Sequence, residues 1–103
     1  MSLFIVKDGI KNVAYKRDQN GKQILGTNYY AISYDFKSNE GYIEKKANDL
    51  WRLYTQIGQK LGHSRYHNFK TFNHCILKLI ELKGNNDVIV CNSSEIEKYI
   101  EKR

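Results

Sequence analysis

The sequence predicts a single domain of the α+β class, in which an antiparallel meander of three to four strands precedes two amphipathic helices, a short strand and a C-terminal helix. Three observations predict this order. Turn residues divide the first third of the chain into short extended segments, apolar residues in the middle recur at helical spacing, and a final apolar run leads into a helix-capping pattern. With 103 residues, 41% of them hydrophobic, we expect the chain to fold as one domain. We expect the helices to pack on one face of the sheet.

The first third of the chain predicts the meander. Residues 2–7 form an apolar strand, and Asp8-Gly9 is a strong two-residue hairpin signal because both central positions of a type I′ turn need positive φ. Residues 10–17 return as a second strand. Residues 18–21, Asp-Gln-Asn-Gly, predict another turn of the same chemistry, and residues 22–36 are then extended.

The end of this extended segment is rich in tyrosine and alternates between two faces. Tyr30, Ile32, Tyr34 and Phe36 share one face, and Tyr29 lies on the other. A sheet that is open on one side presents rings for stacking unpaired bases, with Tyr15 and Tyr29 as candidates, or docks a protein partner. The alternative is that these tyrosines contribute to a core on both faces.

The middle of the chain predicts a long amphipathic helix over residues 38–61. At about 100° per residue, its apolar side chains fall on one face. That face consists of Ile43, Ala47, Leu50, Trp51, Tyr54, Ile57 and Leu61. Gly62 follows at the position where a left-handed residue commonly ends a helix.

A second helix is predicted over residues 64–83, and Gly84-Asn85-Asn86 ends it. Residues 87–91 predict a short apolar strand. Ser94 and Glu97 then have the spacing of a capping box, which starts a short last helix. The apolar face of the second helix consists of Tyr66, Phe69, Phe72, Ile76, Leu79 and Ile80.

All three histidines fall within or beside this second helix. His63, His67, Lys70, His74 and Lys78 recur at spacings of 4, 3, 4 and 4, which places them in a stripe on the solvent side of a helix. Such a stripe can lie along phosphates.

The positive charge of the chain is concentrated in the same region. The formal net charge is +6, and the segment from Leu50 to Ile80 holds no acidic residue. A basic segment of this kind favours a polyanionic partner. Its cations are Arg52, Lys60, Arg65, Lys70 and Lys78.

Three other interpretations of the histidine region stay open. His63 and His67 have the i, i+4 spacing that places two imidazoles on one metal ion, although no third ligand is near and we expect no metal. A turn centred on Gly62 between two helices permits a helix-turn-helix. The stripe is otherwise a solvated helix face.

Enzymatic chemistry has little support in the sequence. Paired carboxylates, a glycine-rich phosphate loop and a G-x-S-x-G motif are all missing, so we expect neither an enzyme nor a cofactor. Cys75 and Cys91 do not make a disulfide framework in a chain of this size, and we interpret them as buried thiols of a cytoplasmic protein. The start of the chain lacks a signal-peptide pattern, and no apolar run is long enough for a membrane helix.

The sequence therefore favours a small, basic, non-enzymatic protein that binds DNA or RNA. Arg52, Lys60, Arg65 and the histidine stripe are its predicted contacts. The alternative is a protein-binding module, such as a small phage or mobile-element inhibitor of a host protein. The abundance of Lys, Asn, Ile and Tyr indicates AT-rich coding, which by itself raises the lysine content.

Overall fold

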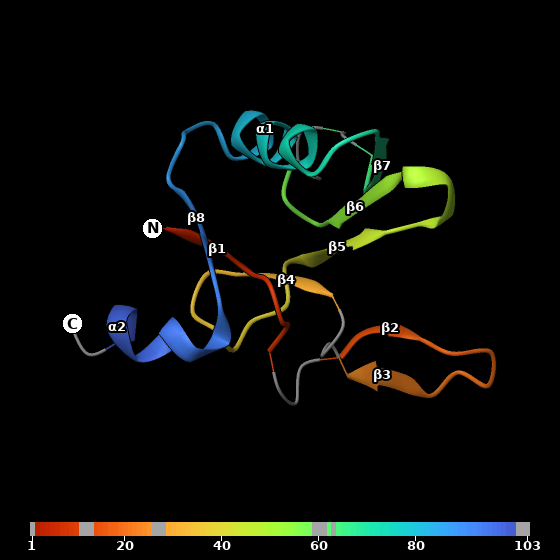
Figure 1. The fold of residues 1–103 in the computed structure, drawn as a ribbon, viewed down its shortest axis with the longest axis horizontal. Helices are drawn as coiled ribbons and strands as arrows, with labels where there is room; N and C mark the ends of the chain where they lie inside the picture. The colour runs from red at the N-terminus through yellow and green to blue at the C-terminus, as the bar shows by residue number, and fades with distance from the viewer. Residues whose placement is uncertain (1, 11–13, 26–28, 59–61, 63, 101–103) are drawn as a thin grey trace.

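The computed structural model describes residues 2–10, 14–25, 29–58, 62 and 64–100. Within them, six strands form a mixed sheet in the order β7-β6-β5-β4-β1-β8, and two more form a separate ribbon (Figure 1). The α+β class is confirmed. The sheet strands are β1 (Leu3–Val6), β4 (Tyr30–Ser33), β5 (Gly41–Lys45), β6 (Trp51–Thr55), β7 (Tyr66–Phe69) and β8 (Val88–Cys91), and the ribbon strands are β2 (Ala14–Arg17) and β3 (Gln23–Leu25).

Both α-helices of the described chain lie in its last third. Helix α1 (Phe72–Lys83) follows β7, and a 3₁₀ turn, η3 (Ser93–Glu95), leads into the short helix α2 (Ile96–Ile100). None of the described helices is long and apolar enough to cross a membrane.

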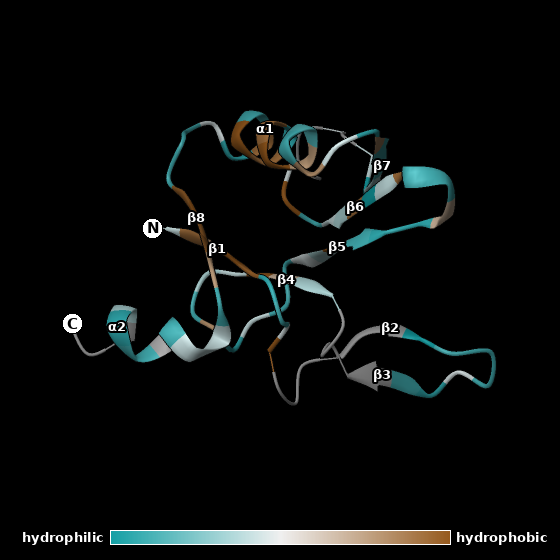
Figure 2. Cartoon of the chain, in the orientation of Figure 1, coloured by the Kyte–Doolittle hydropathy of each residue, from teal (hydrophilic) through white to brown (hydrophobic). Residues whose placement is uncertain are grey.

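Strand β1 is buried along its whole length because it has neighbours on both sides. It pairs antiparallel with β4 and parallel with β8, and all four of its residues are buried. Its continuous apolar sequence is typical of a strand that is covered on both faces. Figure 2 shows β1 and β8 as the most hydrophobic strands of the sheet. The predicted strands at residues 2–7 and 87–91 are therefore confirmed.

The predicted hairpin across Asp8-Gly9 is wrong. A turn does occur there, with Gly9 at φ 77° and its amide donating to the Val6 carbonyl at 3.1 Å, but β2 does not return alongside β1. Strand β2 pairs with β3 instead. The predicted turn at residues 18–21 is the one that makes a hairpin, because the Asp18 carboxylate accepts hydrogen bonds from the amides of Asn20 and Lys22.

The predicted helix over residues 38–61 is also wrong, because this segment forms the hairpin β5–β6. Strands β5 and β6 are joined by the 3₁₀ turn η1 (Ala47–Asp49), in which Asn48 and Asp49 have φ 64° and 58°. The sheet is buried on both faces, so apolar side chains of β5 and β6 point to both sides. In the sequence, their spacing resembles that of one helical face.

The second predicted helix begins later than expected. Its first part is the strand β7, and α1 starts after Thr71, whose side chain accepts a hydrogen bond from the His74 amide at 3.2 Å. The predicted end is confirmed, since Gly84 adopts φ 88° and its amide donates to the Ile80 carbonyl at 2.9 Å.

Two cores lie on opposite faces of the sheet, so the expectation of helices on one face is wrong. The α1 core contains Cys75 and Leu79 of α1 packed on the sheet. On the other face, Tyr99 of α2 packs against Phe4, with ring centroids 5.1 Å apart. Phe36 belongs to this second core rather than to the face of Ile32, because its backbone turns to φ 63°.

Candidate nucleic-acid interface

A row of tyrosines crosses the sheet on the face opposite α1. Tyr29 precedes β4, and Tyr42, Tyr54 and Tyr66 come from the adjacent strands β5, β6 and β7. Successive ring centroids are 5.3, 5.3 and 4.8 Å apart, close to the spacing of neighbouring strands. Register explains the row, because Tyr42 pairs with Tyr54 and Tyr54 with Tyr66. We call these four residues the tyrosine ladder.

The exposure of the ladder rises toward the edge of the sheet. Tyr42 is 4% exposed, Tyr54 is half-buried, and Tyr66 is 54% exposed. Strand β7, which carries Tyr66, is an edge strand of the sheet. The ladder therefore begins in the core and ends in a ring that is accessible to a partner.

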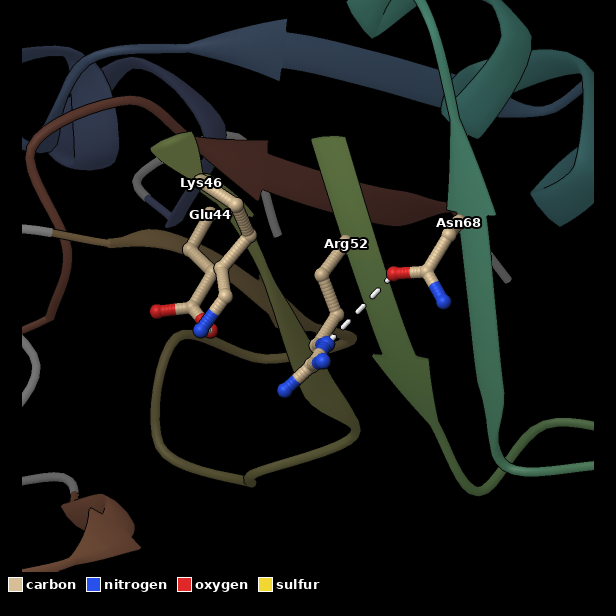
Figure 3. Close-up of polar contacts among 4 residues, drawn as sticks. All are labelled: Glu44, Lys46, Arg52 and Asn68. Atoms are coloured by element: carbon tan, nitrogen blue, oxygen red, sulfur yellow. Dashed lines mark hydrogen bonds and ion pairs between the residues drawn. The ribbon is translucent and has the colours of Figure 1, made fainter. Parts of the chain in front are cut away.

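Arg52 lies beside this accessible ring. Its Cζ lies 5.8 Å from the Tyr66 ring centroid, a distance at which a guanidinium is attracted to the ring. Its Nε donates to the Asn68 side-chain oxygen at 3.5 Å (Figure 3). Arg52 and Asn68 face each other in the β6–β7 register, so the two strands hold the guanidinium against the sheet. We call Arg52, Tyr54, Tyr66 and Asn68 the β6–β7 surface.

One buried carboxylate lies beside this surface. Glu44 faces Arg52 in the β5–β6 register, and Lys46 Nζ lies 3.6 Å from its Oε1 (Figure 3). Lys46 thus offsets the charge of Glu44. In the described part of the chain, no carboxylate forms an ion pair with Arg52.

Two further cations flank β7 at its ends. Arg65 precedes the strand and Lys70 follows it, and both are exposed. Of the predicted contacts, the structure therefore brings Arg52, Arg65 and Lys70 around the β6–β7 hairpin. His67 lies on β7 but on its other face, where its ring centroid is 6.2 Å from that of Phe69.

The predicted helical stripe is wrong as a continuous feature, because His67 and Lys70 precede the helix. His74 and Lys78 do remain one turn apart on α1. The Lys78 ammonium forms an ion pair with Glu81 at 3.3 Å, and His74 Nδ1 lies 3.0 Å from the Thr71 hydroxyl. Both predicted residues of α1 are thus engaged within the protein.

Four predicted positions have other outcomes. Lys60 and His63 lie outside the described residues, and so does the side chain of Tyr15 on β2. Tyr29 is partly buried and packs against Tyr42, a member of the second core. Of the predicted i, i+4 metal pair, His63 lies outside the described residues and His67 is in a strand rather than a helix.

Among the residues that the structure describes, no group of three His, Cys, Asp or Glu side chains is arranged to hold a metal ion.

Sequence reasoning missed Tyr54, Tyr66 and Asn68 because it assigned this region to helices. The signal that identifies them is the alternation in β7, where Tyr66 and Asn68 share one face and His67 and Phe69 the other.

Comparison of the chain with protein-family models, with curated proteins and with solved structures finds no match. Function is therefore inferred from the chemistry of the β6–β7 surface. Its groups are a cation, two aromatic rings and an amide, all of which recognise partners by charge, stacking and hydrogen bonding.

Proposed function

We propose that the chain is a small, basic, non-enzymatic nucleic-acid-binding protein and that the β6–β7 surface is its contact. The observation that carries this proposal is the pairing of Arg52 with the exposed ring of Tyr66. A guanidinium binds phosphate through several donors, and a tyrosine ring beside it offers a stacking face. This combination suits the alternating phosphates and bases of a nucleic acid.

The distribution of charge supports the same surface. The acid-free segment from Leu50 to Ile80 folds into β6, β7 and most of α1. Two carboxylates in the neighbouring elements are offset by lysines, because Glu44 pairs with Lys46 and Glu81 pairs with Lys78. Arg52 on β6, together with Arg65 and Lys70 at the two ends of β7, gives the described part of this surface three positive charges.

Fluorescence anisotropy tests the proposal with labelled single-stranded DNA, duplex DNA and RNA. If Arg52, Arg65 and Lys70 each contact one phosphate, the slope of log K against log salt should be about −2 to −3, measured between about 50 and 200 mM salt. Replacing Arg52 with Gln keeps the side chain polar, removes the charge and weakens binding. The absence of salt-dependent binding to all three probes at tens of micromolar protein contradicts the proposal.

A protein-binding module is the second candidate, and the same residues favour it. Tyrosine and arginine are enriched among the residues that anchor protein interfaces, and Tyr66 is a large exposed ring on an edge strand. In this version the chain acts as a small phage or mobile-element inhibitor of a host protein. A partner that is retained from a nuclease-treated host lysate, and lost with Tyr66→Thr, favours this candidate.

Both candidates place the protein in the cytoplasm. Cys75 and Cys91 are buried free thiols, which is the usual state of cysteines in a reducing compartment.

A further inference from the structure

The tyrosine ladder ends at the sheet edge in Tyr66, whose ring is more exposed than those of Tyr42 and Tyr54. Tyr42 contacts the rings of both Tyr29 and Tyr54, and Tyr54 contacts those of both Tyr42 and Tyr66. Within the described part of the chain, Tyr66 has one tyrosine neighbour, and more than half of its surface is open. One further planar ring at this position extends a row that the protein itself begins.

We propose that a single unpaired nucleobase stacks on Tyr66, so that the protein binds single-stranded rather than duplex nucleic acid. This inference rests on the proposed function. In a duplex, both faces of an internal base are covered by neighbouring base pairs, so a protein ring reaches a base face only at an end or after unstacking. In a single strand, the bases can splay out onto aromatic side chains.

The groups around Tyr66 fit both parts of one nucleotide. Arg52 uses Nε to hold Asn68, and its terminal nitrogens extend away from that contact (Figure 3). They supply donors for the phosphate. The Asn68 oxygen faces Arg52 while its amide nitrogen is turned away, which leaves that nitrogen to donate to a carbonyl on the base edge (Figure 3).

The burial of the other rings limits the site to one stacked base. Tyr42 and Tyr54 each have a ladder ring on both sides, and Tyr42 is inside the core. Stacking energies measured per base correspond to a gain of about 5- to 150-fold in affinity. This gain adds to the affinity that comes from contacts between cations and phosphates, which does not depend on the bases.

Three probes of about 15 nucleotides separate stacking from charge: oligothymidylate, an abasic strand with the same number of phosphates, and a duplex. We expect the wild-type protein to bind oligothymidylate about 5- to 150-fold more tightly than the abasic strand, and more tightly than the duplex at equal phosphate concentration. This comparison uses unmodified protein and does not depend on how any variant folds.

Two variants of Tyr66 then locate the stacking. Tyr66→Thr removes the ring but keeps a strand-favouring residue, and it should reduce the affinity for oligothymidylate to that for the abasic strand. Tyr66→Phe keeps the ring and should bind as the wild type does. Leu77→Ser is the matched control, because Leu77 is 60% exposed on α1, on the other side of the sheet, and its replacement should change no affinity.

The outcomes distinguish this inference from the proposed function. Equal binding of oligothymidylate and the abasic strand overturns base stacking and leaves nucleic-acid binding standing. Wild-type affinity in a folded Tyr66→Thr variant overturns the site. Failure of the wild-type protein to bind any of the three probes overturns both proposals.

Discussion

Asp8 and Ser93, which are 85 positions apart in the sequence, are joined by two hydrogen bonds. The Ser93 amide donates to Asp8 Oδ1 at 2.7 Å, and the Ser93 hydroxyl donates to Oδ2. Ser93 is the first residue of η3, and α2 follows η3 directly. The contact therefore attaches the C-terminal segment to the chain just after β1 and helps to bring Tyr99 onto Phe4. The Asp8 carboxylate thus acts as a cap for a helical segment that is remote in sequence.

The first prediction concerns this cap. Asp8→Ala should lower the free energy of unfolding by about 1 kcal/mol, because two donors of Ser93 lose their acceptor. Asp8→Asn, which retains one acceptor oxygen, should cost less. Urea denaturation measures both effects, with Ser94→Ala as the control because Ser94 is exposed. An Asp8→Ala variant as stable as the wild type would mean that ring packing alone holds α2.

The second prediction is a loss of stability in acid. Burial raises the pKa of Asp8, but the hydrogen bonds from Ser93 outweigh it and leave that pKa below its ordinary value. The backbone amides of Ser38 and Lys37 lower the pKa of Asp35. When the folded pKa is below the unfolded one, the unfolded state binds more protons, so this stability is present above about pH 4 and is lost as the pH falls through the folded values.

Urea midpoints at a series of pH values between about 5 and 2 measure this loss. The midpoint should decrease with pH in the wild type and decrease less in the double variant Asp8→Asn, Asp35→Asn. Parallel curves for the two proteins would show that other carboxylates control acid stability.

The third prediction concerns the close approach of β5 to β6. A Cβ at Gly41 would lie 2.0 Å from the Tyr54 carbonyl oxygen, and Gly41 has φ 137°. Gly41→Ala should therefore separate the two strands and lower the free energy of unfolding by more than about 3 kcal/mol. Gly21→Ala is the matched control, because φ is +80° there but nothing lies within 4 Å of the added atom. We expect Gly21→Ala to lower the free energy of unfolding by about 1 kcal/mol. Thermal melts of both variants measure the two effects. Similar melting temperatures for the two variants would contradict the close contact.

The fourth prediction decides between the two cationic surfaces. Arg52→Gln should lower the affinity for nucleic acid and reduce the salt slope by about 0.7–0.9. Lys78→Ala should leave both nearly unchanged, because this ammonium is paired with Glu81 and its side chain is only 20% exposed. Anisotropy titrations at several salt concentrations measure the slopes. The reverse result would move the contact to α1.

The fifth prediction concerns thiol reactivity. Burial raises the pKa of Cys75 and of Cys91 to about 11, so neither thiol forms the reactive thiolate at neutral pH. A disulfide reagent should label neither cysteine in the folded protein and both in urea. Ser94→Cys, at an exposed position, should be labelled at once and serves as the control. Rapid labelling of Cys75 or Cys91 in native protein would contradict their burial.

Sequence analysis correctly predicts an element where the residue pattern fits only one type of secondary structure. Residues 3–6 are all apolar, and the turn at residues 18–21 has a local chemistry that does not depend on the rest of the fold. By contrast, residues 38–61 look helical because Ile43 and Leu53 enter one core while Tyr42 and Tyr54 enter the other. A strand buried on both faces loses its alternation, and only the β-favouring residues and the left-handed turn at Asn48 indicate it.

The candidate site was predicted in part for the same reason. Arg52, Arg65 and Lys70 were identified from charge, which is visible in any secondary structure. Tyr66 was assigned to a helical core because its exposure depends on β7 being an edge strand. Strand order is a tertiary property, set by pairings between distant segments, and local pattern does not contain it.

The parallel pairing of β1 with β8, from Leu3 with Val88 to Val6 with Cys91, also fixes a delay in biosynthesis. A ribosome adds about 5–20 residues per second, so about 4–17 s pass between the synthesis of these partner strands. During that interval Leu3–Val6 lacks its β8 neighbour, so this apolar strand exposes unpaired backbone N–H and C=O groups to other nascent chains. Each new molecule thus passes through a period in which this unpaired strand is open to aggregation.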